Sequence, residues 1–558
     1  MQPTILVLGS GPIRIGQGIE FDYSCVHCMW ALQKMGYRAI VINNNPETVS
    51  TDFDTGDGLY FEPVTFADVM KVIEHEKPEG VIVQFGGQTA INLAEPLHQA
   101  GVKIVGTSWS SIAAAEDRQK FDALMSQLGI LRPAGAAVRS IEEARSVAAK
   151  VGFPVLVRPS FVLGGQAMMV CHSPDQLDAY YRLAEDANPG QPVLVDEYVL
   201  GTEAELDVIS DGEQTLVPGI MEHIERAGVH SGDSMAVYPP VRLSDQVQAE
   251  MIRCACKLAR ALEIRGLMNI QFVVKDERAY VIEVNPRASR TVPYLSKITG
   301  LPMIRLATEC AMGKNLADSG YEGGLWWVDP QREQGGYVIP QSEFEAGAPI
   351  IPKAIVYGVK APVFSFQKLT RVEPSLGPEM KSTGEILGVD STYEAALFKA
   401  FVASGININR SGFIVLTVNH DDRPEAVNIA AQLSGRGFRI ACTPGTGQAL
   451  QSAGIACDLV NKIQDGSPNL LDLISGGQVA LMINTPSVSG NSTSEAATIR
   501  RACIEAGIPC ITSIDTAAAL VQVLEYFEKP ELASCKPLHE YLQGPKAPAL
   551  GSMVAQTR

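Results

Sequence analysis

Three side chains with oxygen donors fall on two runs of residues that the sequence predicts to be one β-hairpin. Gln271 lies on the first run, 269–274, and Glu283 and Asn285 lie on the second, 279–285, after a short polar turn. Side chains two positions apart on a strand share a face, so Glu283 and Asn285 should point the same way. Carboxylate and amide oxygens suit Mg²⁺ or Mn²⁺ that bridges nucleotide phosphates.

Basic residues flank this hairpin in the sequence. Arg287 and Arg290 follow it directly and can clamp a transferred phosphoryl group, because guanidinium groups match phosphate oxygens. Arg118 lies upstream, and Arg158 precedes a loop, 159–166, that can fold over phosphates. Such a set performs phosphoryl transfer by positioning and charge neutralisation. The alternative is a surface hairpin with incidental polar residues.

Further polar residues lie between the loop and the hairpin. Glu203 and Asp207 suit contacts to a ribose or a cation, and the glycine-broken stretch 228–234 can supply backbone groups. Near the N-terminus, the glycines of 9–18 resemble a dinucleotide-binding loop. Their spacing departs from the strict fingerprint, and the second strand ends in asparagines at 43–45 where an acidic residue is expected, so NAD binding is disfavoured.

The elements that must position these side chains form three blocks. Strands and helices alternate in the first hundred residues, which predicts a parallel sheet with covering helices. A second block, 116–313, holds the hairpin, and a third α/β block starts near residue 408. The stretch 315–349 lacks periodicity and is interpreted as a long surface connection. The tail after Lys536 carries Pro, Gly and Gln and is expected to be mobile.

Composition excludes several classes of protein. The 558 residues carry 45 Lys+Arg against 62 Asp+Glu, a net charge of −17, so the surface attracts neither nucleic acid nor anionic membrane. An anionic ligand must therefore be held by local basic residues. The N-terminus runs straight into a predicted strand, so no signal peptide is expected, and no stretch is apolar enough to span a bilayer.

The 11 cysteines are scattered, which fits a reducing cytoplasm better than a disulfide framework. Two close pairs, Cys25 with Cys28 and Cys254 with Cys256, lie in predicted helices. Half a zinc site is the alternative for such a pair, but a structural zinc needs four ligands. Both pairs are interpreted as buried helix cysteines.

Several long runs resemble the large subunit of carbamoyl phosphate synthetase, within the ATP-grasp superfamily. The superfamily as a whole is resembled at Val157–Ser160 and Ile282–Arg287. The runs that resemble the large subunit in particular are Arg14–Tyr23, Asn45–Asp52, Gln84–Gln88, Met221–Ser234 and Gly377–Glu385. The resemblance implies an α/β fold: a pre-ATP-grasp parallel α/β domain at 1–115, an ATP-grasp α+β domain at 116–313, a helical connection with the end of the synthetase domain at 314–405, a methylglyoxal-synthase-like α/β regulatory domain at 406–535 and a mobile tail at 536–558.

The resemblance is to the second half of such subunits, which phosphorylates carbamate with ATP. It implies a glutamine-hydrolysing ligase that feeds arginine and pyrimidine biosynthesis, with a glutaminase small subunit and a chain carrying the first, carboxyphosphate-forming half as partners. Whether the chain is a split subunit or a fragment stays open. A regulatory protein with an inactive ATP site and a biotin-carboxylase-like ATP-grasp ligase are the rival hypotheses.

The resemblance also implies site residues. Divalent metal is implied at Gln271, Glu283 and Asn285, catalysis at Arg287 and Arg290, and potassium near Glu203, His223 and Val229. Nucleotide contacts are implied at Arg118, Arg158, Gly164, Gly165, Glu197, Val199, Glu203, Gly228, Val229, His230, Ser231, Gln271 and Glu283. A one-residue gap in the alignment makes Glu197 and Val199 the least secure of these, and Gln166 stands where some relatives have Arg.

The third block resembles the regulatory domain of the same family, which binds UMP or IMP in enteric relatives. Thr443 and Thr446 follow a strand and offer hydroxyls and amides to a phosphate, and Arg423 and Lys462 can add charge. An ordinary strand–helix turn is the alternative. The segment 487–494 carries extra small polar residues around the expected phosphate loop.

Activation by ornithine is doubtful on the sequence. Glu225 and Asp233 match carboxylates of ornithine-activated relatives, but Ala361 stands where those relatives carry Glu.

Overall fold

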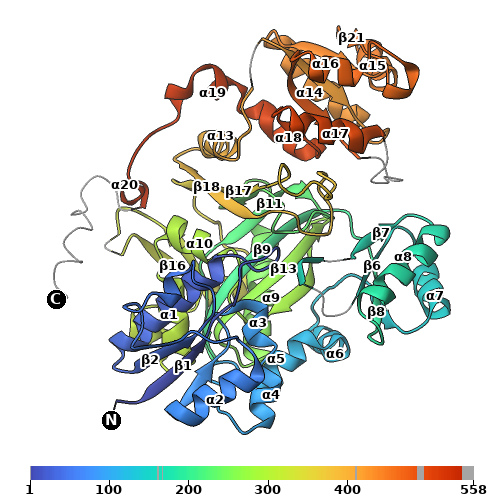
Figure 1. Ribbon diagram of the computed structural model, residues 1–558. Coiled ribbons are helices and arrows are strands. Elements are labelled where there is room, and N and C mark those ends of the chain that lie inside the picture. Colours follow the sequence, from blue (N-terminus) through green and yellow to red (C-terminus); the bar gives the residue numbers. More distant parts are fainter. Residues whose placement is uncertain are drawn as a thin grey trace.

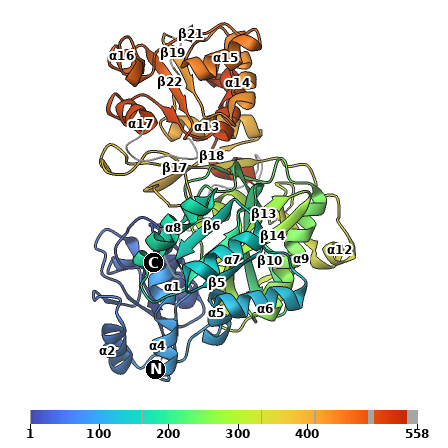
Figure 2. The same ribbon diagram turned by 90° about the vertical axis from the view of Figure 1, so that its right-hand side faces the viewer.

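The computed structural model describes residues 2–159, 163–165, 167–332, 334–408, 411–486 and 495–542. Gln166, the segment 487–494 and residues 543–558 of the predicted tail lie outside the described residues. In two perpendicular views the third block lies at one end, above the strands of a large central sheet, and a small lobe projects from the side of that sheet (Figures 1 and 2). Among the described residues, no helix has the length and apolar character needed to cross a membrane.

The first block is a parallel sheet with the strand order β3-β2-β1-β4. Its elements are β1 (Thr4–Leu8), α1 (Glu20–Lys34), β2 (Arg38–Ile42), η1 (Val49–Thr51), β3 (Gly58–Tyr60), α2 (Phe66–Glu76), β4 (Gly80–Ile82), α3 (Gly87–Ile91), α4 (Ala94–Gln99) and α5 (Trp109–Glu116). The central strands are buried on both faces, as apolar runs without alternation predict. The predicted βαβ order is confirmed, and polar loops leave the carboxyl ends of the strands on one edge.

The side lobe is an antiparallel sheet of order β5-β8-β6-β7, covered by two helices. Its elements are α6 (Arg118–Leu128), β5 (Gly135–Val138), α7 (Ile141–Val151), β6 (Val155–Pro159), η2 (Leu163–Gly165), β7 (Met169–Cys171), α8 (Pro174–Ala187) and β8 (Val193–Glu197). Asp117 caps α6 by accepting from the backbone of Lys120, and Gly129 ends it in a left-handed conformation.

The central sheet carries the predicted hairpin. Its elements are β9 (Thr202–Asp211), β10 (Thr215–Val217), β11 (Ile220–Arg226), β12 (Ala236–Tyr238), α9 (Asp245–Ala261), β13 (Arg265–Lys275), β14 (Arg278–Asn285), α10 (Val292–Thr299) and α11 (Met303–Ala311). Strands β13 and β14 pair antiparallel, with Gln271 opposite Glu283 and Asn269 opposite Asn285. A β-bulge between Gln271 and Phe272 shifts the register there, and beyond it Glu283 and Asn285 share a face.

The interpretation of 315–349 as a surface connection is wrong. The stretch contains η3 (Leu316–Ser319), β15 (Gly324–Val328), β16 (Gly336–Pro340) and α12 (Gln341–Ala346). Strand β15 is buried along its whole length between β10 and β16, and the indole of Trp326 donates to Thr299 O at 3.0 Å. The apolar run of this strand is only four residues long, 325–328, and lies between glycines and an Asp-Pro pair, which is why the strand was missed.

The segment 314–405 is therefore only partly helical. It continues with β17 (Tyr357–Val363), β18 (Gly384–Asp390) and α13 (Tyr393–Ala403). Strands β15 to β18 all join the central sheet, in the order β16-β15-β10-β9-β11-β12-β17-β18, and β13 pairs with β9 beside this path.

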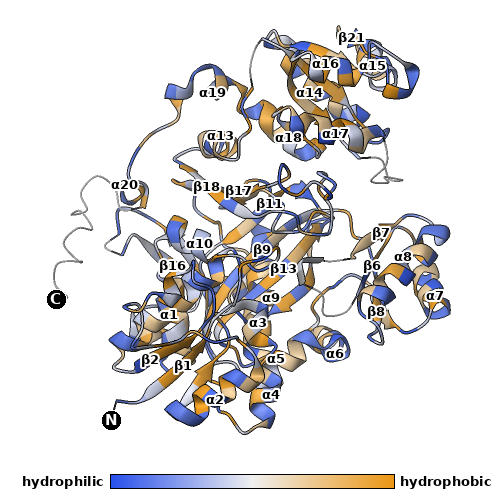
Figure 3. Ribbon diagram, viewed as in Figure 1, coloured by the Kyte–Doolittle hydropathy of each residue, from blue (hydrophilic) through white to orange (hydrophobic). Residues whose placement is uncertain are grey.

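The third block is a parallel sheet of order β21-β20-β19-β22-β23. Its elements are β19 (Phe413–Thr417), α14 (Arg423–Gly435), β20 (Arg439–Cys442), α15 (Pro444–Ser452), β21 (Asp458–Leu459), η4 (Ile463–Asp465), α16 (Leu470–Ser475), β22 (Val479–Asn484), α17 (Glu495–Glu505), β23 (Cys510–Ile511), α18 (Ile514–Gln522) and α19 (Leu524–Glu528). Apolar strands lie inside this block and polar helix faces outside, as in the central sheet (Figure 3).

The chain then returns from the third block to the central sheet. After η5 (Pro530–Leu532), Ser534 donates to Asp390 from both its amide and its hydroxyl, each at 2.8 Å. The helix α20 (Leu538–Leu542) follows, and its Tyr541 and Leu542 are buried in the core shared by the first block and the central sheet. The expectation of a mobile tail is thus wrong for α20.

The two cysteine pairs behave as predicted. Cys25 and Cys28 are free and buried on α1, and Cys254 and Cys256 are free and buried on α9.

Candidate active site

A cavity of about 1010 Å³ lies where the first block, the side lobe and the central sheet meet. All of the predicted nucleotide, metal and catalytic residues line it, although they come from distant parts of the sequence. They are Arg118, Arg158, Gly164, Gly165, Glu197, Val199, Glu203, Gly228, Val229, His230, Ser231, Gln271, Glu283, Asn285, Arg287 and Arg290. The structure thus brings the whole predicted set together, while the role of each residue stays a prediction.

The hairpin face presents a set of oxygen donors to the cavity. Asn285 Nδ2 donates to Glu283 Oε1 at 2.9 Å, which fixes one carboxylate oxygen and turns the amide oxygen of Asn285 away from it. Gln271 Nε2 donates to Ser231 Oγ at 3.3 Å, so its amide oxygen is the free end. One carboxylate and two amide oxygens on adjoining strands fit a hard divalent cation.

Arg287 is held in place on several sides. Its Nη1 donates to Ala288 O at 3.0 Å and its Nη2 to Asn285 Oδ1 at 3.4 Å. Burial lowers the pKa of Arg287, while the charges of Glu283 and Glu116 oppose that shift, so the group remains a cation. A buried cation beside the oxygen donors of the hairpin suits the stabilisation of a developing phosphoryl charge.

Arg290 contacts a residue of the first block. Its Nε lies 2.9 Å from Glu20 Oε1 on α1, and its Nη1 lies 2.8 Å from Met380 Sδ. Arg290 therefore ties the turn after the hairpin to α1 and to the segment before β18.

The two arginines of the side lobe share a partner that the sequence did not single out. Arg118 Nη2 lies 2.5 Å from Asp196 Oδ1, and Arg158 Nη2 lies 3.3 Å from Asp196 Oδ2. Asp196 is on β8, beside β6, and is buried. It holds both guanidinium groups at the cavity wall, where they can meet phosphate oxygens.

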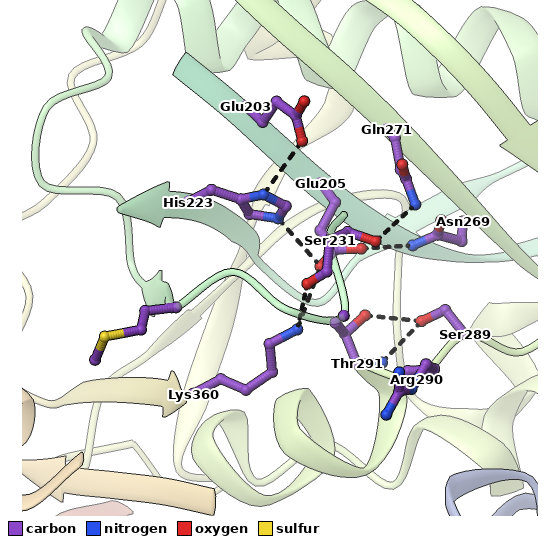
Figure 4. Close-up of polar contacts among 12 residues, drawn as sticks. Glu203, Glu205, His223, Ser231, Asn269, Gln271, Ser289, Arg290, Thr291 and Lys360 are labelled. Atoms are coloured by element: carbon purple, nitrogen blue, oxygen red, sulfur yellow. Dashed lines mark hydrogen bonds and ion pairs between the residues drawn. The ribbon is translucent and has the colours of Figure 1, made fainter. Parts of the chain in front are cut away.

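A buried polar network lies beneath the loop 228–234 (Figure 4). His223 bridges two carboxylates, with Nδ1 3.5 Å from Glu203 and Nε2 3.4 Å from Glu205. Burial alone would lower the pKa of His223, but hydrogen bonds to Glu203 and Glu205 and their charges raise it to about 9. Burial alone would raise the pKa of Glu205, but His223 and Lys360 hold it down at about 2.

Lys360 completes this network, and no sequence signal pointed to it. It is 2% exposed, donates to Ser231 O at 3.3 Å, and lies 3.9 Å from Glu205 Oε1 (Figure 4). Two cations therefore face Glu203 and Glu205. Asp207, in contrast, accepts hydroxyl hydrogen bonds from Ser289 and Thr291 and is fully buried, so it supports the turn after the hairpin and does not reach a ribose.

The glycine loop of the first block is occupied by the protein itself. Gly11 N donates to Asn43 Oδ1 at 3.0 Å, and a Cβ atom at Gly9 would collide with the Asn43 side chain. The Asn43 side chain thus takes up the space beside these two glycines.

The predicted phosphate site of the third block lies at the start of α15. Thr443 stands at the N-cap position of α15, where its hydroxyl donates to Thr417 Oγ1 at 3.3 Å and does not cap the helix. Thr446 Oγ1 accepts from Val418 N at 3.3 Å, and a Cβ atom at Gly445 would lie 2.8 Å from an Arg423 nitrogen. Arg423 Nε is buried without a hydrogen-bond partner in the part of the chain that the structure describes. Lys462 is exposed and lies three residues after the end of β21. The chain between them is held to β20 by a hydrogen bond from Val460 N to Cys442 O.

The two ornithine-type carboxylates have partners within the chain. Glu225 accepts from Thr516 Oγ1 at 2.6 Å, and Asp233 accepts from the backbone of Lys381 and Ser382 at 2.8 and 2.9 Å. Ala361 is buried on β17 and adds no charge there.

Comparisons with known proteins agree with this architecture. Residues 1–114 match the carbamoyl phosphate synthase preATP-grasp domain, and residues 117–319 match the ATP binding domain of the carbamoyl-phosphate synthase L chain. Residues 425–512 match the MGS-like domain. The first two matches together span more than half of the 558 residues.

Solved structures of similar fold include two biotin carboxylases. The biotin carboxylase domain of the Hydrogenobacter thermophilus 2-oxoglutarate carboxylase, bound to MgADP, ADP and bicarbonate, is 16% identical with a TM-score of 0.54, covering 72% of this chain and 89% of that one. The Campylobacter jejuni biotin carboxylase is 15% identical with a TM-score of 0.53, covering 72% and 91%.

An ADP complex of N5-carboxyaminoimidazole ribonucleotide synthetase is 15% identical with a TM-score of 0.52, covering 73% of this chain and 97% of that one. At such identities these likenesses show the fold alone, which is that of ATP-grasp ligases. With its two domain matches and the MGS-like domain that follows them, the chain belongs to the carbamoyl phosphate synthase large-subunit family, as one half of such a subunit.

Proposed function

We propose that the chain phosphorylates carbamate with ATP, as the second half of a glutamine-hydrolysing carbamoyl phosphate synthetase. The observation that carries this proposal is the convergence of the hairpin donors, the arginines and the loop 228–234 on one cavity. A chain with the first, carboxyphosphate-forming half and a glutaminase subunit are the partners that the reaction requires. The setting is the cytoplasm, where the product would feed arginine and pyrimidine synthesis.

In the proposed step, a carbamate oxygen attacks the γ-phosphorus of ATP and the bond to the β,γ-bridging oxygen breaks. The products are carbamoyl phosphate and ADP. Mg²⁺ or Mn²⁺, held by Gln271, Glu283 and Asn285, neutralises charge on the phosphates when bound. Arg287 and Arg290 stabilise the charge of the transferred group, and Arg118 and Arg158 orient the nucleotide phosphates. Potassium near Glu203, His223 and Val229 stays part of the proposal.

His230 contributes a donor at a defined atom. Its Nδ1 accepts from Gly232 N at 3.0 Å, and burial lowers the pKa of the ring, so the neutral ring carries its proton on Nε2. That N–H is free to bond a phosphate oxygen in the cavity, which His230 lines.

The test uses the reverse direction of this step. The isolated chain should form ATP from ADP and carbamoyl phosphate and should not hydrolyse glutamine. Arg287→Met should lower the rate of ATP formation about 10²- to 10³-fold, whereas Arg145→Met, which removes an exposed ion pair with Asp178 in the side lobe, should not lower it. ADP release that depends on bicarbonate and biotin would favour a biotin-carboxylase-like enzyme, and nucleotide binding without turnover would favour an inactive sensor.

A second proposed function is effector binding by the third block. The unpartnered buried Nε of Arg423 beside the start of α15 favours a phosphate there, because a buried N–H donor without an acceptor is costly. The ligand would be a pyrimidine or purine nucleoside monophosphate. Calorimetry with UMP and IMP, in the presence and absence of ATP, tests both binding and coupling, since linkage requires reciprocal effects. Binding that leaves ATP affinity unchanged would contradict a regulatory role.

A further inference from the structure

The run Gln84–Gln88 has no part in the chemistry derived so far, yet its last residue reaches the cavity. Its two glycines let the chain turn closely against β1. A Cβ atom at Gly86 would collide with Leu8 O, and Gly87 has a φ of +65°, with its Cβ position 3.0 Å from the Phe21 ring. Only glycine fits these constraints, and they direct the first turn of α3, with Gln88, towards the central sheet.

Gln88 lies between a cation and an anion of the site. Its Oε1 accepts from Arg287 Nε at 3.2 Å, and its Nε2 donates to Glu116 Oε1 at 3.1 Å and to Asn92 Oδ1 at 2.9 Å. All four residues line the cavity. An amide accepts at one end and donates at the other, so Gln88 can satisfy Arg287 and Glu116 at once.

The same run also binds the backbone of the turn that carries Arg287. Ala288 N donates to Gln84 O at 2.9 Å. Arg287 therefore has its Nε on Gln88, one Nη1 hydrogen on Ala288 O and one Nη2 hydrogen on Asn285. A guanidinium has five N–H donors, so one hydrogen on each Nη remains to meet two phosphoryl oxygens.

We propose that Gln88 is a positioning residue that sets the orientation of the Arg287 guanidinium from the first block. The inference rests on the proposed phosphoryl transfer, in which Arg287 meets the transferred group. Gln88 touches neither nucleotide nor metal in this scheme. Its contribution is to hold one edge of Arg287, so that the two remaining hydrogens face the phosphorus at the moment of transfer.

The substitution Gln88→Leu removes the hydrogen bonds to Arg287, Glu116 and Asn92 with little change of size. We expect kcat for ATP formation to fall about 30-fold, because a misaligned catalytic group costs on the order of 10²-fold or less, while KM for ADP changes less than about twofold. The matched control is Gln99→Leu on α4, where the side chain is exposed and, within the part of the chain that the structure describes, bonds only Glu95. It should leave kcat unchanged.

The substitution Gln88→Glu separates positioning from a merely structural role. Glu at this place keeps an acceptor for Arg287 but sets a second carboxylate against Glu116, whose pKa burial already raises. One of the two carboxylates, at position 88 or at Glu116, then has to bind a proton before a hydrogen bond can form between them. We therefore expect the pH optimum of Gln88→Glu to move to lower pH, with activity partly regained there, whereas Gln88→Leu should show no such shift.

A double-mutant cycle with Arg287→Met decides the inference. If Gln88 acts through Arg287, Gln88→Leu should lower kcat less than about twofold in the Arg287→Met background. A full 30-fold effect in that background, or wild-type activity of Gln88→Leu alone, would overturn the inference and leave the proposed function standing. Full activity of Arg287→Met would instead overturn the proposed role of Arg287, and the inference with it.

Discussion

Glu283 offers the sharpest test of the metal-binding face. The substitution Glu283→Gln keeps the size of the side chain and removes one charge. In the native site, Glu283 Oε1 accepts from Asn285 Nδ2 at 2.9 Å. The new amide must turn its oxygen to Asn285 to keep that bond, and its NH₂ group then faces the cavity, where the cation needs an oxygen. One metal–oxygen bond and one unit of negative charge are lost together.

The expected loss in kcat is about 10²- to 10³-fold, which corresponds to about 2.7–4 kcal/mol of transition-state stabilisation. The concentration of Mg²⁺ that gives half-maximal activity should rise as well. The fold should be unaffected, because the Asn285 bond persists and the side chain is only partly buried. ATP formation from ADP and carbamoyl phosphate, measured over a Mg²⁺ titration, gives both numbers.

Glu277→Gln is the matched control, since Glu277 is in the turn of the same hairpin and outside the cavity, where it accepts a hydrogen bond from Ser244 Oγ. It should keep full kcat and the same Mg²⁺ requirement. Full activity of Glu283→Gln at ordinary Mg²⁺ would refute the metal-binding assignment. A fall in the melting temperature that accounts for the lost activity would refute it equally.

Three further outcomes are expected. Asp390→Asn should destabilise the protein by roughly 1–3 kcal/mol at pH 7 in denaturant unfolding. Burial alone would raise the pKa of Asp390, but Lys399 and Ser534 hold it below its usual value. The difference in unfolding free energy between the two proteins should therefore be full above about pH 4 and vanish as the pH falls further. Trp326→Ala should cost about 3–5 kcal/mol by the same measurement, since it leaves a cavity and an unpaired carbonyl at Thr299. Arg423→Ala should weaken nucleoside monophosphate binding about 10- to 100-fold in calorimetry, through the loss of a charge-assisted hydrogen bond, without changing ATP formation in the absence of effector.

Local signals in the sequence were enough to predict the hairpin and much of the site. Two runs joined by a polar turn predicted β13 and β14, and the two-residue spacing of Glu283 and Asn285 placed both on one face. Strand β15 was missed because its apolar run is only four residues long and is surrounded by Gly, Pro and polar residues. The helix α20 was missed because its apolar residues are few and find their partners only in the folded core.

The supporting partners of the site were beyond the reach of sequence spacing. Asp196 meets Arg118 across 78 positions, and Gln88 meets Arg287 across 199. Lys360 reaches Ser231 from a strand that joins the sheet much later in the chain. Each of these contacts depends on the order of strands and on the approach of two blocks, neither of which leaves a periodic pattern in the sequence.

The return of the chain from the third block has a consequence for modularity. The block is connected twice, through the segment that leaves α13 and through the segment that ends in α20, where Leu542 is buried in the core near Gly300. It is therefore an insertion within a closed loop of chain, and a cut after α13 does not release it as a separable cassette. Deletion of the whole chain after α13 would remove α20 with the block and expose apolar surface of the core, at a cost of about 1.5–3 kcal/mol for Leu542 alone. A chimera that exchanges this block with that of a relative would therefore have to include α20, or other apolar residues that cover the same core surface.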